Sequence, residues 1–355
     1  MPLDALILVA KFPTPGSSKT RLTPTLTPVD AASLASAMLK DTILTMAKVK
    51  AQDKAQDTAL DSTCPSASLY SNITKVIVYA PSDERTYRQM HQLLCRALKL
   101  DDRDLPRPNL KSLNWHLIPM PMPMHSSTVS LELKKPDLGA KLTTALSTVR
   151  STPSPHPPAK SIVFIGMDSP ELEHTDIERA LRRTHVTTKG VAHAHISPAA
   201  DGGYALLAIP PSAPTPAVFK DVEWSCATTF QSQYSALTRI GLVVEIGRVI
   251  CDIDEIADVV TLGLKLMKDQ KKVPCPTNMY NTREVLFTDQ LLHLILEKLF
   301  SSSGQSLKRT EEDVRDLFSR HHFFGAVSWV VSLAWLGFGM NVIYNQFRVK
   351  WKLGV

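Results

Sequence analysis

The sequence lacks the paired cysteines that would mark a zinc site or a disulfide framework. Its five cysteines are scattered along 355 residues, and none forms a C-x-x-C pair. An odd, dispersed set of this kind is typical of a reducing compartment, so we expect a cytoplasmic protein. The five are Cys64, Cys95, Cys226, Cys251 and Cys275.

Other functional signatures are missing as well. There is no basic stripe interleaved with aromatic residues, and the net charge of +6 is mild, so nucleic acid is not an expected partner. The histidines form no H-E-x-x-H pattern. The apolar run Leu6–Ala10 is too short for a secretory signal and follows Asp4, so it indicates a buried strand instead.

Apolar runs and amphipathic segments alternate along the chain. Apolar runs predict strands at residues 6–10, 75–80, 115–118, 161–166, 191–196 and 205–209. Helical spacing predicts helices at residues 30–48, 138–149 and 176–183, and a further helix that carries Tyr87, Met90, Leu93 and Leu94. We expect Asp30 to cap the first of these helices. Strand and helix in turn predict an α/β fold: a Rossmann-like, mostly parallel central sheet with helices on both faces.

The loop after the first expected strand runs Lys11-Phe12-Pro13-Thr14-Pro15-Gly16-Ser17-Ser18-Lys19-Thr20-Arg21-Leu22. A loop at the carboxyl edge of such a sheet is where ligands bind. Gly16 allows close approach of a phosphate, and Lys11, Lys19 and Arg21 supply positive charge. The pattern is not a Walker P-loop. The alternative is a basic surface turn.

Three acidic motifs follow later in the chain. Asp168 comes directly after the most apolar expected strand, where it could hold a divalent cation or cap the next turn. Asp201-Gly202-Gly203-Tyr204 offers a general base, free backbone N–H groups and an aromatic face, or an ordinary hairpin turn. Asp252 and Asp254 alternate, so they could present two carboxylates to one metal or cap a helix near Glu255.

Taken in order, these segments resemble a family of small, mostly bacterial GT-A-like proteins that includes arsenosugar-biosynthesis glycosyltransferases. The family is distantly similar to the nucleotidyltransferases that act on molybdopterin or phospholactate. The resemblance spans residues 6–286. The matching segments are Lys11-x-Pro13-x-Pro15-Gly16-x-x-Lys19-Thr20-Arg21-Leu22, Asp41-Thr42, Asp137-Leu138-Gly139, Gly166-x-Asp168-x-Pro170, Pro198-Ala199-Ala200-Asp201-Gly202-Gly203-Tyr204, Trp224-Ser225 and Asp252-x-Asp254.

The resemblance implies a GT-A nucleotide-diphospho-sugar transferase fold. It implies that Lys11, Pro15, Gly16, Lys19 and Arg21 wrap the nucleotide diphosphate. It also implies that Asp168, with Asp254, binds Mg²⁺ or Mn²⁺, and that Asp201, Gly202, Gly203 and Tyr204 lie on the sugar or acceptor side. The sequence departs from the family pattern at Cys226 and Ala227, where Ser or Thr is commoner.

The chain divides into a transferase domain at residues 1–288 and a helical C-terminal extension at residues 289–355. Phe323–Ile343 is almost wholly apolar, and about 20 such residues suffice to span a bilayer. A transmembrane helix at residues 323–345 would attach the enzyme domain to a membrane. The alternative is a hydrophobic hairpin packed on the domain or on a partner.

Three functions remain open at this point. The first is a metal-assisted glycosyltransferase that moves a sugar from a nucleotide-sugar to an unknown hydroxyl acceptor, with Asp201 as base and Asp168 at the metal. The second is a nucleotidyltransferase that uses a nucleoside triphosphate and releases pyrophosphate. The single Gly16 between prolines favours the first over the second. The third is a non-catalytic, membrane-tethered nucleotide-binding protein.

Overall fold

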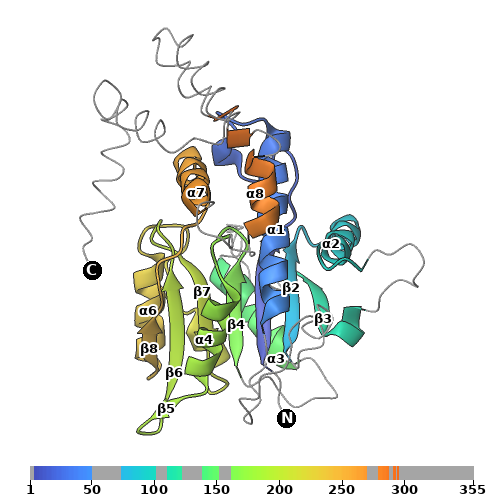
Figure 1. Ribbon diagram of the computed structural model, residues 1–355. Helices are drawn as coiled ribbons and strands as arrows, with labels where there is room; N and C mark the ends of the chain where they lie inside the picture. The colour runs from blue at the N-terminus through green and yellow to red at the C-terminus, as the bar shows by residue number, and fades with distance from the viewer. Residues whose placement is uncertain are drawn as a thin grey trace, which may run out of the picture.

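An eight-stranded sheet forms the centre of the molecule (Figure 1). The computed structural model describes residues 4–49, 73–100, 110–121, 138–151, 161–269, 279–287, 291–292 and 294–295. The strands are β1 (Ala5–Lys11), β2 (Thr74–Ala80), β3 (Trp115–Pro119), β4 (Ile162–Gly166), β5 (Thr187–Thr188), β6 (Val191–Pro198), β7 (Tyr204–Ile209) and β8 (Val243–Ile246). Their order is β3-β2-β1-β4-β7-β6-β5, and β8 pairs with β6.

The sheet is mixed: most of its strands run in one direction, as predicted, but β5 and β7 run against them. The strands β1 to β4 are mutually parallel, whereas β7 runs antiparallel to both β4 and β6. The reason is the short connection at residues 199–203, because a tight turn can join only antiparallel strands. The strand β8 then pairs in parallel with β6.

Helices cover both faces of the sheet, as predicted. The longer ones are α1 (Pro28–Lys48), α2 (Glu84–Ala97), α3 (Leu138–Ser151), α4 (His174–Thr184), α6 (Thr229–Arg239), α7 (Ile256–Asp269) and α8 (Tyr280–Phe287), and α5 (Thr215–Val218) is one turn. Alternate residues of a strand point to opposite faces. Leu6 and Leu8 of β1 therefore pack with α1, α2, α4, α7 and α8, whereas Ala5 and Ile7 pack with α3, α5 and α6.

The expected elements match the observed ones within a few residues, and their ends have local causes. The helix α1 begins at Pro28, and its cap is Thr27 rather than the predicted Asp30: the Thr27 hydroxyl accepts from the Asp30 backbone N–H at 3.2 Å. Proline suits the first turn of a helix because that turn has no use for its missing N–H. The sequence did not predict α5, α6, α8, β5 or β8, whereas the helix considered near Glu255 is α7, which begins at Ile256.

The predicted C-terminal extension is largely outside the described residues. Residues 296–355, including the predicted transmembrane helix at 323–345, are not among them. Within the described part of the chain, no helix is both long and apolar enough to cross a bilayer.

Candidate active site

The predicted site residues come from several strand ends at one edge of the sheet. The strands β1, β4, β6 and β8 point the same way, so the segments that follow them meet at their carboxyl edge. The antiparallel β7 begins at this edge with Tyr204. A register shift between Ser197 and Pro198 turns the chain out of the β6–β7 ladder just before Asp201.

The loop after β1 is closed by its own hydrogen bonds. The Ser18 hydroxyl accepts from the Thr14 backbone N–H at 3.0 Å, and the Ser17 and Ser18 N–H groups both donate to the Thr14 carbonyl at 3.1 Å. Gly16 has a φ of +78°, which glycine adopts without strain. The loop is therefore a preformed turn at the carboxyl edge, and the exposed Lys11 ammonium donates to the carbonyl of Ser17 inside it.

Lys19 joins this loop to two acidic segments. Its Nζ lies 2.7 Å from Asp168 Oδ1 and 2.7 Å from Asp254 Oδ1, and only 7% of its side chain is exposed. Burial lowers the pKa of the Lys19 ammonium group, but the attraction of Asp168 and Asp254 outweighs burial and raises the pKa above its ordinary value. Arg21 Nη1 lies 3.5 Å from Asp254 Oδ2 and is largely exposed.

Three carboxylates come together beside this ion pair. Asp201, Asp252 and Asp254 each place an oxygen within 4.8 Å of the others. Burial, then the charges of Asp201 and Asp254 among others, raises the pKa of Asp252 to about 7. Clustered carboxylate oxygens are the ligand type that Mg²⁺ and Mn²⁺ prefer, so these residues fit a hard divalent cation.

Backbone hydrogen bonds explain why these segments converge. The Ile250 N–H donates to the Pro198 carbonyl at 2.9 Å, and the Ala200 N–H donates to the Ile250 carbonyl at 3.2 Å. Three residues further on, the Ile253 N–H donates to the Asp168 carbonyl at 2.9 Å. The chain at residues 250–254 is thus hydrogen-bonded to the segments that follow β4 and β6, and this places Asp252 near Asp201.

The alternative role considered for Asp252 and Asp254 was to cap a helix near Glu255, but a different residue makes these capping hydrogen bonds. Asp258 Oδ2 accepts from the N–H groups of Asp254 and Glu255 at 3.1 and 2.8 Å, just ahead of α7. The carboxylates of Asp252 and Asp254 are therefore not needed for the cap. They face the loop and the cluster instead.

The turn at Asp201 is built by its glycines. Asp201 Oδ1 accepts from the Gly203 N–H at 2.7 Å. Gly202 has a φ of +93°, and a Cβ there would lie 2.2 Å from the Ala227 carbonyl oxygen. The hydroxyl of Tyr204 donates to Gln233 Oε1 at 3.2 Å, and burial raises its pKa. The Tyr204 hydroxyl is thus held by the buried Gln233, and its side chain lines the pocket.

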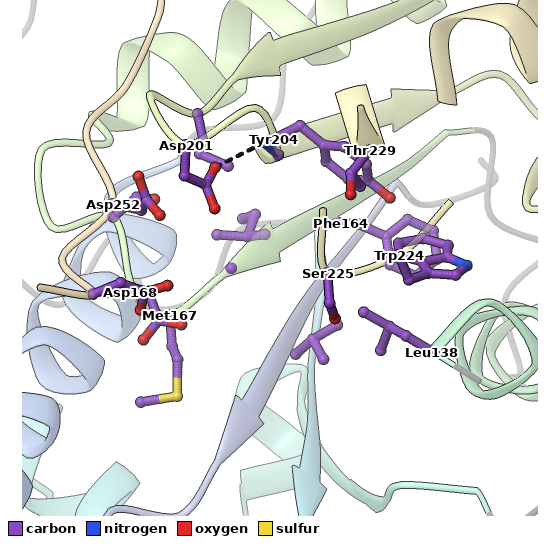
Figure 2. A pocket seen from close by; sticks show the side chains of 18 of the residues that line it. Leu138, Phe164, Met167, Asp168, Asp201, Tyr204, Trp224, Ser225, Thr229 and Asp252 are labelled. Atoms are coloured by element: carbon purple, nitrogen blue, oxygen red, sulfur yellow. Dashed lines mark hydrogen bonds between the residues drawn. The ribbon is translucent and has the colours of Figure 1, made fainter. Parts of the chain in front are cut away.

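A pocket of about 510 Å³ opens between these segments. Figure 2 shows Asp168, Asp201 and Asp252 on one side, with Phe164, Trp224 and Leu138 on the other. The lining residues are Val9, Arg21, Leu138, Leu142, Phe164, Ile165, Gly166, Met167, Asp168, Ser169, Ala199, Asp201, Gly203, Tyr204, Ala205, Trp224, Ser225, Cys226, Ala227, Thr229, Asp252 and Asp254. One half of the pocket is acidic and the other is apolar and aromatic.

The pocket brings together six of the residues predicted for the site. They are Arg21, Asp168, Asp201, Gly203, Tyr204 and Asp254. Lys19 and Gly202 lie directly behind this lining, through the ion pairs of Lys19 and the turn at Gly202. Lys11, Pro15 and Gly16 are exposed on the loop outside it.

Sequence reasoning left two parts of the site unassigned. Asp252 was a candidate ligand by its alternation with Asp254, but nothing local showed that Asp201 would complete the cluster. Leu142 and Phe164 of the apolar wall gave no signal, because such residues have the pattern of core residues. Leu138 stood in the matching segment Asp137-Leu138-Gly139, but no role was predicted for it.

Part of the sequence matches a known family model. Residues 121–226 match the family described as "Uncharacterized protein conserved in bacteria (DUF2064)". This segment includes Asp168, Asp201 and Trp224, whereas the loop after β1 and residues 252–254 lie outside it. No curated protein matches the sequence.

Solved structures share the fold. A protein of Desulfovibrio desulfuricans G20, assigned provisionally as a nucleotide-diphospho-sugar transferase, matches with a TM-score of 0.58 and 19% identity over 84% of this chain and 98% of its own. A CMP:2-keto-3-deoxy-manno-octonic acid synthetase complexed with CTP matches at 11% identity and a TM-score of 0.38, over 75% and 99% of the two chains. A cytidylyltransferase of Leptospira borgpetersenii serovar Hardjo-bovis (strain JB197) has the same identity and score, over 83% and 97%.

These structures differ in how similar they are to this chain. The first shows the fold alone at its low identity, and the other two are too distant to carry an argument. The resemblance found in the ordered motifs is thus supported over residues 121–226, where the chain matches the bacterial family model, and the first structure shows the same α/β fold.

Proposed function

We propose that this chain is a metal-assisted glycosyltransferase, which passes a sugar from a nucleotide-sugar donor to a hydroxyl acceptor. The observation that carries the proposal is the meeting of the basic loop after β1 with a carboxylate cluster: Lys19 reaches Asp168 and Asp254, and Asp254 belongs to the cluster with Asp201 and Asp252. Phosphate-binding and metal-binding groups are thus adjacent, as a nucleotide diphosphate with a bound cation requires.

The loop residues would bind the diphosphate. Lys19 and Arg21 lie at the acidic cluster, and Arg21 is exposed enough to reach phosphate oxygens in a bidentate fashion. Lys11, Pro15 and Gly16 form the exposed turn of the same loop, where backbone and ammonium groups can approach a phosphate. Lys19 would exchange a carboxylate partner for a phosphate oxygen when the donor binds.

The carboxylates would divide two roles. Asp252 and Asp254 would hold Mg²⁺ or Mn²⁺, with Asp168 beside them on the far side of Lys19. Bound there, the cation would act as a Lewis acid on the departing diphosphate. A carboxylate that binds a cation is a weak base, so the more exposed Asp201 is the better candidate for the base.

The proposed transfer forms one bond, breaks one bond and moves one proton. The acceptor oxygen forms a bond to the anomeric carbon of the donor sugar, and Asp201 takes the hydroxyl proton. The bond between that carbon and the diphosphate oxygen breaks, and its electron pair leaves with the nucleoside diphosphate. Lys19 and Arg21 stabilise the charge that gathers on the diphosphate.

Calorimetric titration of nucleoside diphosphates with and without Mn²⁺ tests the binding half of this proposal. We expect Mn²⁺ to tighten binding of at least one nucleotide by about 10-fold or more, and Asp254→Asn to abolish that gain. Asp201→Asn should keep the gain. Asp221→Asn, an exposed aspartate in an ion pair with Arg239, is the matched control.

The products distinguish the reaction. With nucleotide-sugars we expect slow release of nucleoside diphosphate to water, which Asp201→Asn abolishes. Release of pyrophosphate from nucleoside triphosphates would instead establish the nucleotidyltransferase alternative. No metal-dependent nucleotide binding by the wild-type chain would overturn both. Nucleotide binding that needs no metal and leads to no product would favour the non-catalytic alternative.

A further inference from the structure

The half of the pocket opposite the carboxylates is an apolar, aromatic wall. Phe164, Leu138 and Trp224 lie across the pocket from Asp201 and Asp252 (Figure 2). We define the aromatic wall as Leu138, Leu142, Phe164, Tyr204 and Trp224. Its residues come from β4, β7, α3 and the chain before α6, and not from the loop after β1 that is proposed to bind the diphosphate.

The aromatic wall is held in place by close contacts. The ring of Phe164 meets Phe219 edge to face, with centroids 5.3 Å apart, and Phe219 in turn lies 6.1 Å from Trp224. A Cβ on Gly139 would lie 2.7 Å from Trp224 Nε1, so the indole packs directly against the backbone of α3. Such a preformed surface can bind an apolar group with little reorganisation.

A buried amide fixes the remaining ring of the aromatic wall. Gln233 is fully buried; its Nε2 donates to the Val218 carbonyl at 2.8 Å, and its Oε1 accepts from the Tyr204 hydroxyl at 3.2 Å. Tyr204 therefore keeps its polar end away from the pocket. Its ring lies 6.4 Å from that of Trp224.

The charges of the pocket are unfavourable for a second anion. Among the described residues that line it, four are aspartates and Arg21 alone is a cation. Arg21 and the neighbouring Lys19 are already close to Asp254. A phosphate on the acceptor would find no cation on the aromatic wall and would face the carboxylates, which costs free energy through desolvation and repulsion.

We propose that the acceptor is an uncharged, hydroxyl-bearing molecule with an apolar or aromatic body, which packs on the aromatic wall with a hydroxyl toward Asp201. This inference rests on the proposed function. It names the chemical class of the acceptor, and it excludes phosphorylated acceptors. A sugar linked to an aromatic or aliphatic group has the required chemistry, since aromatic rings bind the apolar faces of sugars and of other rings.

Two probes of matched size test the charge and the apolar body of the acceptor together. Phenyl β-D-glucopyranoside is neutral and carries a ring, whereas glucose 6-phosphate is anionic and carries none. Each is titrated by calorimetry into the full chain with Mn²⁺ present. We expect phenyl glucoside to bind at least about 10-fold more tightly than glucose 6-phosphate. Equal or tighter binding of the phosphate, or no binding of phenyl glucoside up to its solubility limit, overturns the proposal.

A wall variant with a surface control locates the binding. Leu138 is 38% exposed, so Leu138→Lys changes the aromatic wall without placing a charge in the hydrophobic core. Val186→Lys is the control, because Val186 is 39% exposed and lies outside the pocket lining. We expect Leu138→Lys to lower the affinity for phenyl glucoside by about 10-fold and Val186→Lys to leave that affinity unchanged. Equal effects of the two variants contradict the proposal.

Nucleotide titrations on the same proteins separate this inference from the proposed function. Leu138→Lys could weaken the binding of the nucleoside diphosphate with Mn²⁺ and leave the binding of phenyl glucoside unchanged. In that case the aromatic wall binds the nucleotide base, and the acceptor inference fails while the proposed function stands. If no nucleotide binds the wild-type chain at all, the proposed function fails, whatever phenyl glucoside does.

Discussion

Lys19 Nζ lies 2.7 Å from Asp254 Oδ1, across 235 residues of sequence, and the same ammonium reaches Asp168 at 2.7 Å. A buried lysine thus offsets part of the negative charge of two acidic segments. It occupies their carboxylates as a cation would. In the proposed function, nucleotide and metal binding would both have to rearrange these ion pairs, so Lys19 would couple the two ligands.

The first prediction concerns the removal of this ammonium. Lys19→Met should destabilise the fold by about 1–3 kcal/mol, because it leaves two partly buried carboxylates without their partner. The same change should tighten binding of Mn²⁺ alone, since the competing charge is gone, and should weaken nucleoside diphosphates. Urea unfolding and calorimetry measure these effects.

Lys220→Met, at an exposed lysine, is the control and should change none of the three. An unchanged Mn²⁺ affinity in Lys19→Met would show that the ammonium and the cation use different carboxylates.

The second prediction concerns the turn that carries Asp201. Gly202→Ala places a methyl group 2.2 Å from the Ala227 backbone oxygen at a φ of +93°, so the turn must open. We expect a loss of about 2–4 kcal/mol in the free energy of unfolding and a loss of transfer activity. Chemical denaturation and nucleoside diphosphate release are the measurements.

Gly190→Ala gives the matched comparison. Gly190 has a φ of +81° but no atom within 4 Å of its added Cβ. It should cost only about 1 kcal/mol, through backbone strain. Equal costs at the two glycines would mean that the contact with Ala227 does not constrain the turn.

The third prediction concerns a buried acid outside the pocket. Asp41 of α1 accepts from the Asn281 N–H and Nδ2 at 2.9 and 2.8 Å and from the Thr282 N–H at 2.7 Å, at the start of α8. Asp41→Ala removes every one of these acceptors and should destabilise by about 2–4 kcal/mol. Hydrogen exchange should rise most at the amides of residues 281 and 282.

Asp30→Ala, at the exposed start of α1, should cost less than about 1 kcal/mol and leave those amides protected. If exchange of the 281 and 282 amides is the same in Asp41→Ala as in the wild type, Asp41 does not hold α8 in place.

Local patterns predicted the elements well, and tertiary contacts decided the rest. The apolar runs at residues 6–10 and 162–166 were read as buried strands because their burial on both faces leaves no alternation to misread. Asp252 and Asp254 were recognised as neighbours by strand periodicity alone. The strand β7 was predicted, but the prediction of a mostly parallel sheet did not include its antiparallel direction. That direction follows from the hairpin turn that was the alternative for Asp201-Gly202-Gly203-Tyr204.

The sequence predicted individual site residues, but it did not predict which of them contact one another. Arg21, Asp168, Asp201 and Asp254 line one pocket as expected. Their pairing depends on contacts between segments far apart in sequence, such as Lys19 with Asp254, which no local pattern contains. Asp41 shows the converse: a segment matched to the family proves to be a structural cap.

The last prediction is a pH dependence that arises in the core. Lys75 on β2 is fully buried, with its Nζ 5.8 Å from the centroid of the Trp115 ring, and burial lowers its pKa to about 8. The unfolded lysine titrates near 10.5. Between these two values the unfolded state binds more protons than the folded state, so stability rises with pH across this window.

Below pH 8 the full cost of burying the charge is present, about 3 kcal/mol from the difference in pKa. Lys75→Met should therefore raise the free energy of unfolding at pH 7 by about 1–3 kcal/mol and remove the rise between pH 8 and pH 10.5. Urea unfolding at a series of pH values measures both effects, with Lys220→Met as the exposed control. A variant that keeps the wild-type slope would show that Lys75 stays charged in the folded protein throughout this range.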